Sequence, residues 1–179
     1  MMAAMPDVVT HRYNPAVGAC LNICALPDSQ ASTVLDSLRR GFRPTLKPAY
    51  LERRRITEQW LAQAASQVLA RPVEQTPAYF FLGDFSHLVD RSRPASLVVP
   101  LSILPPGSIT FTLGDSMSVS EETARKIYTL HEMATMFGSG GVVAGFGVSD
   151  RDGFQERFIE VQIWDRSFIS TCARKKIDT

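Results

Sequence analysis

The strongest strand pattern in this chain is Arg157-Phe158-Ile159-Glu160-Val161-Gln162-Ile163-Trp164-Asp165. Its aliphatic residues alternate with polar and aromatic ones, and this two-residue period is typical of a β-strand that presents two different faces. Glu160 lies on the face opposite the aliphatic residues, beside an amide and two large aromatic side chains, although glutamate is uncommon inside strands. Either this face lines a cleft, or it is the solvated outer face of an antiparallel sheet.

The composition favours one domain with a full hydrophobic core. The chain has 179 residues, of which 45% are hydrophobic, and it is too short to favour two domains. We therefore expect a single domain over residues 1–179 with its core between about 8 and 169. Nineteen basic and 18 acidic residues give a net charge of +1, so contact with a phosphate or a nucleic acid must come from a local cluster such as Arg53-Arg54-Arg55.

The sequence carries no motif of a disulfide-rich, metal-binding, membrane-spanning or signal-peptide-bearing protein. The three cysteines form no Cys-x-x-Cys pair, so we expect neither a disulfide framework nor a zinc knuckle, and we expect reducing surroundings. The histidines show no metal-ligand spacing, so no metal site is predicted. Without a signal-peptide pattern or a run of membrane-spanning length, we expect no membrane segment and a cytoplasmic protein, or a secreted effector without a cleavable signal.

Three helices are predicted. Asp28 can cap the first, which ends before Gly41. The second runs from about Ala49 to Ala70, between two prolines. The third runs from about Glu121 to Phe137, with Ser118 and Glu121 spaced as a capping box and His131 as a partly buried, hydrogen-bonded residue.

Two charges fall inside the apolar sector of the second helix. Arg54 and Glu58 are separated by one helical turn, so they can pair with each other. One interpretation is a structural ion pair at the edge of the core. The other is an arginine aimed into a binding site.

Further strands are predicted from β-branched and aromatic runs. Pro100 indicates that its strand lies at an edge of the sheet or contains a bulge. The glycine-rich segment 138–153 is predicted to be a flexible loop that leads into the Glu160 strand. The strands are expected at residues 8–10, 79–82, 96–99 and 109–112.

Taken in order, these segments resemble the ADP-ribosyltransferase fold, and in layout they are most similar to the DarT family of toxins, which modify DNA with ADP-ribose from NAD. The resemblance implies an α+β fold with a mixed, mainly antiparallel split β-sheet core and about three helices. The segments that carry the resemblance are Thr10-His11, Val34 to Gly41, Leu51-Glu52-Arg53-Arg54-Arg55, Tyr79 to Leu82, Phe111 to Asp115, and Glu160 to Asp165 with Phe168-Ile169.

The same resemblance implies that the chain transfers ADP-ribose from NAD, a co-substrate, to a macromolecular acceptor that is a protein or a nucleic acid. Glu160 and Arg54 would be the catalytic residues. A carboxylate near the ribose stabilises the oxocarbenium-like transition state, and an arginine binds the pyrophosphate with two parallel hydrogen bonds. Arg53 is the second choice for the pyrophosphate.

The remaining site residues would bind the two ends of NAD. His11 and Asn14 would bond the ribose hydroxyls of the adenosine, and Tyr79 or Phe81 would stack on the nicotinamide. A toxin of this kind implies an antitoxin or another regulatory partner. Two alternatives stay open: a ligand-binding or partner-binding protein that retains the fold without catalysis, and a small hydrolase of unrelated chemistry.

Overall fold

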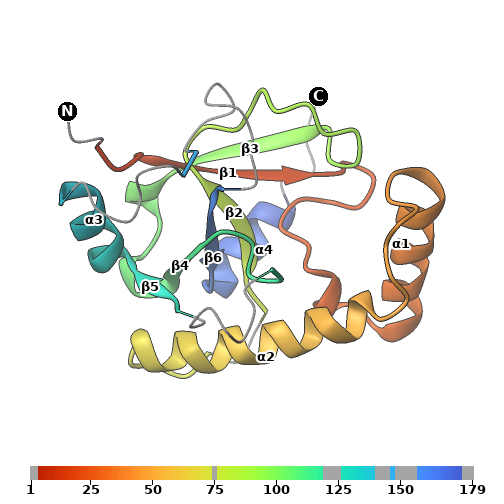
Figure 1. Ribbon diagram of the computed structural model, residues 1–179, viewed down its shortest axis with the longest axis horizontal. Coiled ribbons are helices and arrows are strands. Elements are labelled where there is room, and N and C mark those ends of the chain that lie inside the picture. The colour runs from red at the N-terminus through yellow and green to blue at the C-terminus, as the bar shows by residue number, and fades with distance from the viewer. Residues whose placement is uncertain (1–3, 74–75, 119–125, 140–145, 148–156, 175–179) are drawn as a thin grey trace.

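A six-stranded antiparallel sheet forms the centre of the α+β fold in a computed structural model, which describes residues 4–73, 76–118, 126–139, 146–147 and 157–174 (Figure 1). The strands are β1 (Val8–Tyr13), β2 (Ala78–Leu82), β3 (Ala95–Pro100), β4 (Ile109–Leu113), β5 (Tyr128–Thr129) and β6 (Ile159–Ile163). The helices are α1 (Asp28–Gly41), α2 (Tyr50–Val68), α3 (Leu130–Gly138) and α4 (Arg166–Arg174), with 3-10 turns at Ile23–Ala25, Leu101–Ile103 and Pro106–Ser108.

The strand order is β3-β1-β2-β6-β4-β5, and each neighbouring pair is antiparallel. The predicted antiparallel character is therefore confirmed. The described strands form one continuous hydrogen-bonded sheet rather than a split one, because β2 and β6 pair along their length. Pro100 lies on the edge strand β3, as predicted, where a residue without an N–H breaks no inner ladder.

One face of the sheet is apolar and carries the main core. Val161 of β6 lies directly opposite Phe80 of β2 and Phe111 of β4, and all three are buried. Helices α3 and α4 cover this face, with Met133 and Phe168 packed against the strands. The predicted aliphatic face of β6 is therefore a core face.

The other face of β6 is polar but not solvated. Glu160 is only 7% exposed and Gln162 is fully buried. Helix α2 covers part of this face, with Leu61 and Ala65 packed in one cluster with Trp164, and it runs along the lower side of the sheet in Figure 1, with α1 beyond its first turn. The interpretation of this face as the wet outer side of a sheet is therefore wrong.

Helices α1 and α2 lie within two residues of the predicted bounds, and two details differ. The residue before α1 is Pro27, and Asp28 is the first helical residue rather than a side-chain cap. Ile56 of α2 is 52% exposed, although the apolar pattern placed it inward. Packing against a sheet on one side only leaves the edge of the helical stripe in solvent.

Helix α3 is shorter than predicted. Its capping box is formed by Thr129 and Glu132, because Tyr128–Thr129 first pairs with β4 as strand β5. Met133 is buried, whereas His131 is exposed, so the prediction of a partly buried histidine is wrong. The predicted start of this helix, at about Glu121, and most of the glycine-rich segment lie outside the described residues.

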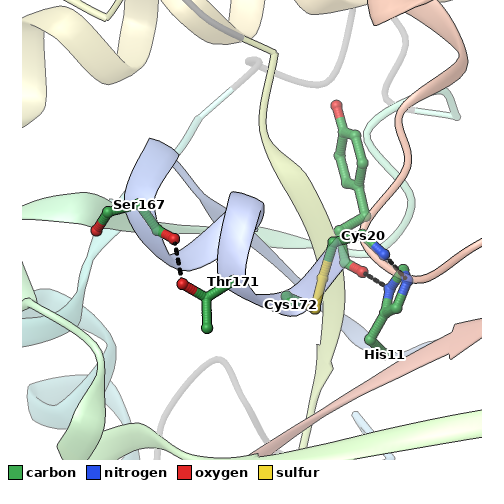
Figure 2. The surroundings of a disulfide bond; sticks show 6 residues. His11, Cys20, Ser167, Thr171 and Cys172 are labelled. Atoms are coloured by element: carbon green, nitrogen blue, oxygen red, sulfur yellow. Dashed lines mark hydrogen bonds between the residues drawn. A yellow bond between two sulfur atoms is a disulfide. The ribbon is translucent and has the colours of Figure 1, made fainter. Parts of the chain in front are cut away.

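A disulfide joins Cys20 to Cys172, which contradicts the expectation from the cysteine count. The two Cα atoms are 6.2 Å apart, although 152 positions separate them in the sequence. Figure 2 shows the bond between the loop after β1 and α4, a helix in addition to the three predicted. A spacing rule cannot detect a contact at this separation, and disulfides persist in oxidising surroundings, so the cysteine count is not evidence for a reducing environment. Cys24 is free.

No helix in the described part of the chain is both long enough and apolar enough to cross a membrane.

Candidate functional site

A cavity of about 620 Å³ lies beside the polar face of β2 and β6, and its wall includes the loop after β1 and the start of α2. This volume is typical of small-molecule sites. Six residues predicted from the sequence line it: His11, Asn14, Arg54, Tyr79, Phe81 and Glu160. Arg53, predicted as a second pyrophosphate ligand, is exposed on α2 and does not line the cavity.

Glu160 ends a buried polar chain on the cavity face of the sheet. Gln162 Nε2 donates to Glu160 Oε1 at 3.0 Å and to Thr112 Oγ1 at 3.0 Å. Gln162 Oε1 in turn accepts from Thr110 Oγ1 at 2.9 Å, and Trp164 Nε1 donates to that hydroxyl at 2.8 Å. Strand pairing fixes these neighbours, because Thr112 lies opposite Glu160 and Thr110 lies opposite Gln162. The carboxyl group is therefore held in one orientation.

Burial raises the pKa of Glu160 to about 7, and the nearby charge of Asp115 acts in the same direction. The nearby Ser116 hydroxyl, Arg54 and Gln162 act in the opposite direction and lower this pKa. The Ser116 hydroxyl makes no hydrogen bond among the described residues. Near neutral pH the carboxyl group is therefore close to half ionised, so small changes in its surroundings change its charge.

Arg54 and Glu58 form the predicted ion pair. Arg54 Nε donates to Glu58 Oε1 at 3.1 Å, and the side chains are 11% and 7% exposed. The same carboxylate oxygen accepts from Tyr79 Oη at 2.8 Å and from Asn22 Nδ2 at 2.9 Å. The guanidinium also lies over the Tyr79 ring, 4.1 Å from its centroid.

This pairing leaves part of Arg54 available to a ligand. Within the described residues only Nε makes a hydrogen bond, and the side chain lines the cavity. Burial lowers the pKa of Arg54, but Tyr79, Glu58 and Glu160 outweigh it and raise that pKa, so the guanidinium stays charged. The two interpretations of Arg54 are therefore compatible: its inner edge is structural and its two terminal nitrogens can bind an anion.

His11 is held by the protein at both ring nitrogens. Nδ1 donates to the Tyr79 carbonyl at 2.7 Å, and Nε2 accepts from the Cys20 N–H at 2.8 Å. Burial lowers the pKa of His11 to about 4, so the ring is neutral. The ring stacks on Tyr13 and lies tilted against Phe80. A hydrogen bond from His11 to a ribose, as predicted, would replace one of these two bonds.

Asn14 and Phe81 also have contacts of their own. Asn14 Oδ1 accepts from the Ala16 N–H at 2.9 Å and so holds the turn after β1. Phe81 packs against Phe158 with ring centroids 4.9 Å apart, and it lies directly opposite Glu160 in the strand pairing. An aromatic ring therefore adjoins the carboxyl group on the cavity face.

Sequence reasoning missed two residues that line this cavity. Asn22 Nδ2 donates to Glu58 Oε1 across the base of the first loop, and Asp115 lies beside Glu160. Asp115 lay inside a segment that carried the resemblance, which was the one available signal. The Asn22 contact joins distant segments, so no local pattern indicates it. Among the described residues, no group of three or more His, Cys, Asp or Glu side chains could hold a metal ion.

Comparison of the chain with protein-family models, with curated proteins and with solved structures finds no significant match.

Proposed function

We propose that this protein is an NAD-dependent ADP-ribosyltransferase that acts on a macromolecular acceptor, a protein or a nucleic acid. One observation carries the proposal: a buried glutamate on β6 and an arginine on α2 whose side chain is 11% exposed, both chosen from the sequence for this chemistry, line the same cavity. Their opposite charges suit the two ends of the reacting part of NAD, the cationic nicotinamide riboside and the anionic pyrophosphate.

Arg54 would bind the pyrophosphate. Its terminal nitrogens make no hydrogen bond within the described residues, and Glu58 and Tyr79 hold the guanidinium from behind. A fixed guanidinium loses little freedom when it binds an anion, and its planar fork matches two phosphate oxygens. Arg43 and Arg93 also line the cavity; Asp90 offsets the charge of Arg93 through an ion pair at 2.8 Å, so Arg43 is the one of the two that adds positive charge.

Glu160 would stabilise the transition state. Cleavage of the bond between ribose and nicotinamide develops positive charge on the ribose, and a fixed carboxylate nearby lowers the energy of that state. The positive nicotinamide ring would also lower the pKa of Glu160 on binding, because an opposite charge favours the ionised form. Phe81, directly opposite Glu160, or Tyr79 would contact that ring. Arg54 already lies over one face of Tyr79, and Arg93 lies 5.9 Å from the centroid of the Phe81 ring.

The experiment that tests this function combines titration calorimetry with chromatography. Titration with NAD measures binding, and incubation with NAD measures nicotinamide release. Binding together with slow release would support the transferase, and absence of both would reject it. Labelled NAD offered with oligonucleotides or with a protein lysate then shows which class of acceptor takes the label.

A second candidate is a binding protein without catalysis. The contacts that favour it are the Arg54 and His11 side chains, which the protein already engages through Glu58, Tyr79 and Cys20. A partly protonated Glu160 would also suit a neutral ligand. Binding of NAD or ADP-ribose without any release of nicotinamide would favour this candidate.

A further inference from the structure

Asp115 is the second carboxylate of the cavity. Among the described residues that line it, Asp115 and Glu160 are the two acidic side chains. The backbone brings them together: Thr112 pairs with Glu160, and two residues later the Gly114 N–H donates to the Phe158 carbonyl at 2.8 Å. Gly114 has a positive φ of 90°, which a glycine adopts without strain. The turn after β4 therefore places Asp115 beside the start of β6, near Glu160.

The protein holds the Asp115 carboxylate through one of its two oxygens. Its Oδ1 accepts from the Met117 N–H at 2.8 Å, and its carbonyl accepts from the Ser118 N–H at 2.9 Å. Within the described residues Oδ2 makes no hydrogen bond, and the residue is half-buried. One oxygen thus fixes the side chain while the other is able to accept a proton.

The two carboxyl groups have different surroundings. Glu160 is buried and bonded to Gln162, whereas Asp115 lies in a turn at the cavity wall. The charge of Asp115 contributes to the raised pKa of Glu160, so the two groups interact electrostatically. Paired carboxyl groups with unlike surroundings commonly divide the charge-stabilising and proton-transfer roles between them.

We propose that Asp115 is the general base that accepts the proton of the attacking nucleophile, which is water in hydrolysis or an O–H or N–H group of the acceptor in transfer. This assignment rests on the proposed function. The bond from the ribose C1′ to the nicotinamide nitrogen breaks, and its electron pair neutralises the nicotinamide. A lone pair of the nucleophile forms the new bond to C1′, and the proton of the nucleophile passes to Asp115, which later releases it to water.

The test uses Asp115→Asn and azide. The asparagine amide oxygen can still accept from the Met117 N–H, so the turn is preserved while the base is lost. General-base catalysis contributes about 10²–10⁴-fold, so nicotinamide release into water should fall by about a hundredfold or more. Azide is an anion with no proton to lose, so it should restore release from NAD in Asp115→Asn and form an azide adduct of ADP-ribose.

Two controls accompany this variant. Asp165→Asn makes the same chemical change at a residue that accepts from the Phe168 N–H and does not line the cavity. It should release nicotinamide at the wild-type rate. Asp115→Glu keeps a carboxylate and should retain more activity than Asp115→Asn.

The outcomes separate this inference from the proposed function. Slow release from Asp115→Asn with an unchanged NAD affinity, restored by azide, supports the general base. If the wild type releases nicotinamide and Asp115→Asn does so at the same rate, or azide fails to restore a slow variant, Asp115 is not the base although the transferase assignment stands. If the wild type neither binds nor cleaves NAD, both are overturned.

Discussion

The backbone N–H of Cys20 donates a 2.8 Å hydrogen bond to Nε2 of His11, and the side chain of Cys20 is bonded to Cys172 in α4 (Figure 2). This arrangement ties three parts of the chain together: strand β1, the loop that follows it, and the helix after β6. Because Asn14, Val17 and Asn22 of that loop line the cavity, the disulfide helps to hold the cavity wall.

Reduction of the disulfide should therefore lower both stability and ligand affinity. The bond closes a loop of 152 positions, and removal of such a bond costs about 2–5 kcal/mol of the free energy of unfolding. Thermal unfolding with and without dithiothreitol, repeated on Cys172→Ser, measures this effect. Cys24→Ser, which removes the free cysteine, should keep the wild-type response. An identical melting temperature with and without reductant would contradict a structural role for the bond.

Arg54→Ala should lower stability and NAD affinity together. It leaves the buried Glu58 carboxylate without its ion-pair partner, which costs about 3–5 kcal/mol. It also removes the guanidinium proposed to bind the pyrophosphate, so we expect the dissociation constant for NAD to rise about tenfold or more. Urea unfolding and calorimetry measure the two effects.

Arg53→Ala is the matched control for Arg54→Ala. Arg53 is exposed and does not line the cavity, so both quantities should stay near wild type. Loss of stability in Arg54→Ala without loss of NAD affinity would leave Arg54 as a structural residue alone.

Glu160→Gln should stabilise the fold above neutral pH. Folding raises the pKa of Glu160 from its ordinary value of 4.5 to about 7, so the native state binds more protons than the unfolded state between these values. Stability therefore falls as pH rises through this window, and the loss is about 3 kcal/mol at alkaline pH. Glutamine has no such loss, so the advantage of the variant should grow from about pH 4.5 to about pH 8.

The quantity to measure is the difference in the free energy of unfolding between Glu160→Gln and the wild type, because His11 also makes stability depend on pH. Its pKa falls from 6.5 to about 4 on folding, so the native state binds fewer protons and stability rises with pH across that window. This trend opposes that of Glu160 in the wild type. Urea unfolding of both proteins at several pH values cancels the His11 contribution. A difference that does not change with pH would contradict the raised pKa of Glu160.

The pH dependence of nicotinamide release should report the same carboxyl group. The proposed role requires ionised Glu160, and kcat/KM reports the ionisation of the free enzyme. Since burial raises the pKa of Glu160 to about 7, kcat/KM should fall about tenfold per pH unit below that value. An acidic limb centred near 4.5, the ordinary value, would show that a carboxyl group without a raised pKa controls the rate.

The features that were predicted correctly from the sequence depend on residues only a few positions apart. The alternation along β6 correctly predicted that Glu160 lies on the face opposite the core, and the helical periodicity of α2 correctly predicted that Arg54 points inward. Contacts between distant segments left no such pattern. The Cys20–Cys172 bond, the hydrogen bond from Asn22 to Glu58 and the engagement of both His11 nitrogens each join segments that meet only in the folded chain.

Nicotinamide release by Glu160→Gln measures whether Glu160 is the catalytic carboxylate. The variant keeps the size of the side chain and one oxygen that can accept from Gln162 Nε2 but removes the charge, so NAD should bind with an affinity within about threefold of wild type while nicotinamide release falls about a hundredfold or more. Glu52→Gln, an exposed change on α2, should behave as wild type. Release by Glu160→Gln at the wild-type rate would contradict the assignment of Glu160 as the catalytic carboxylate.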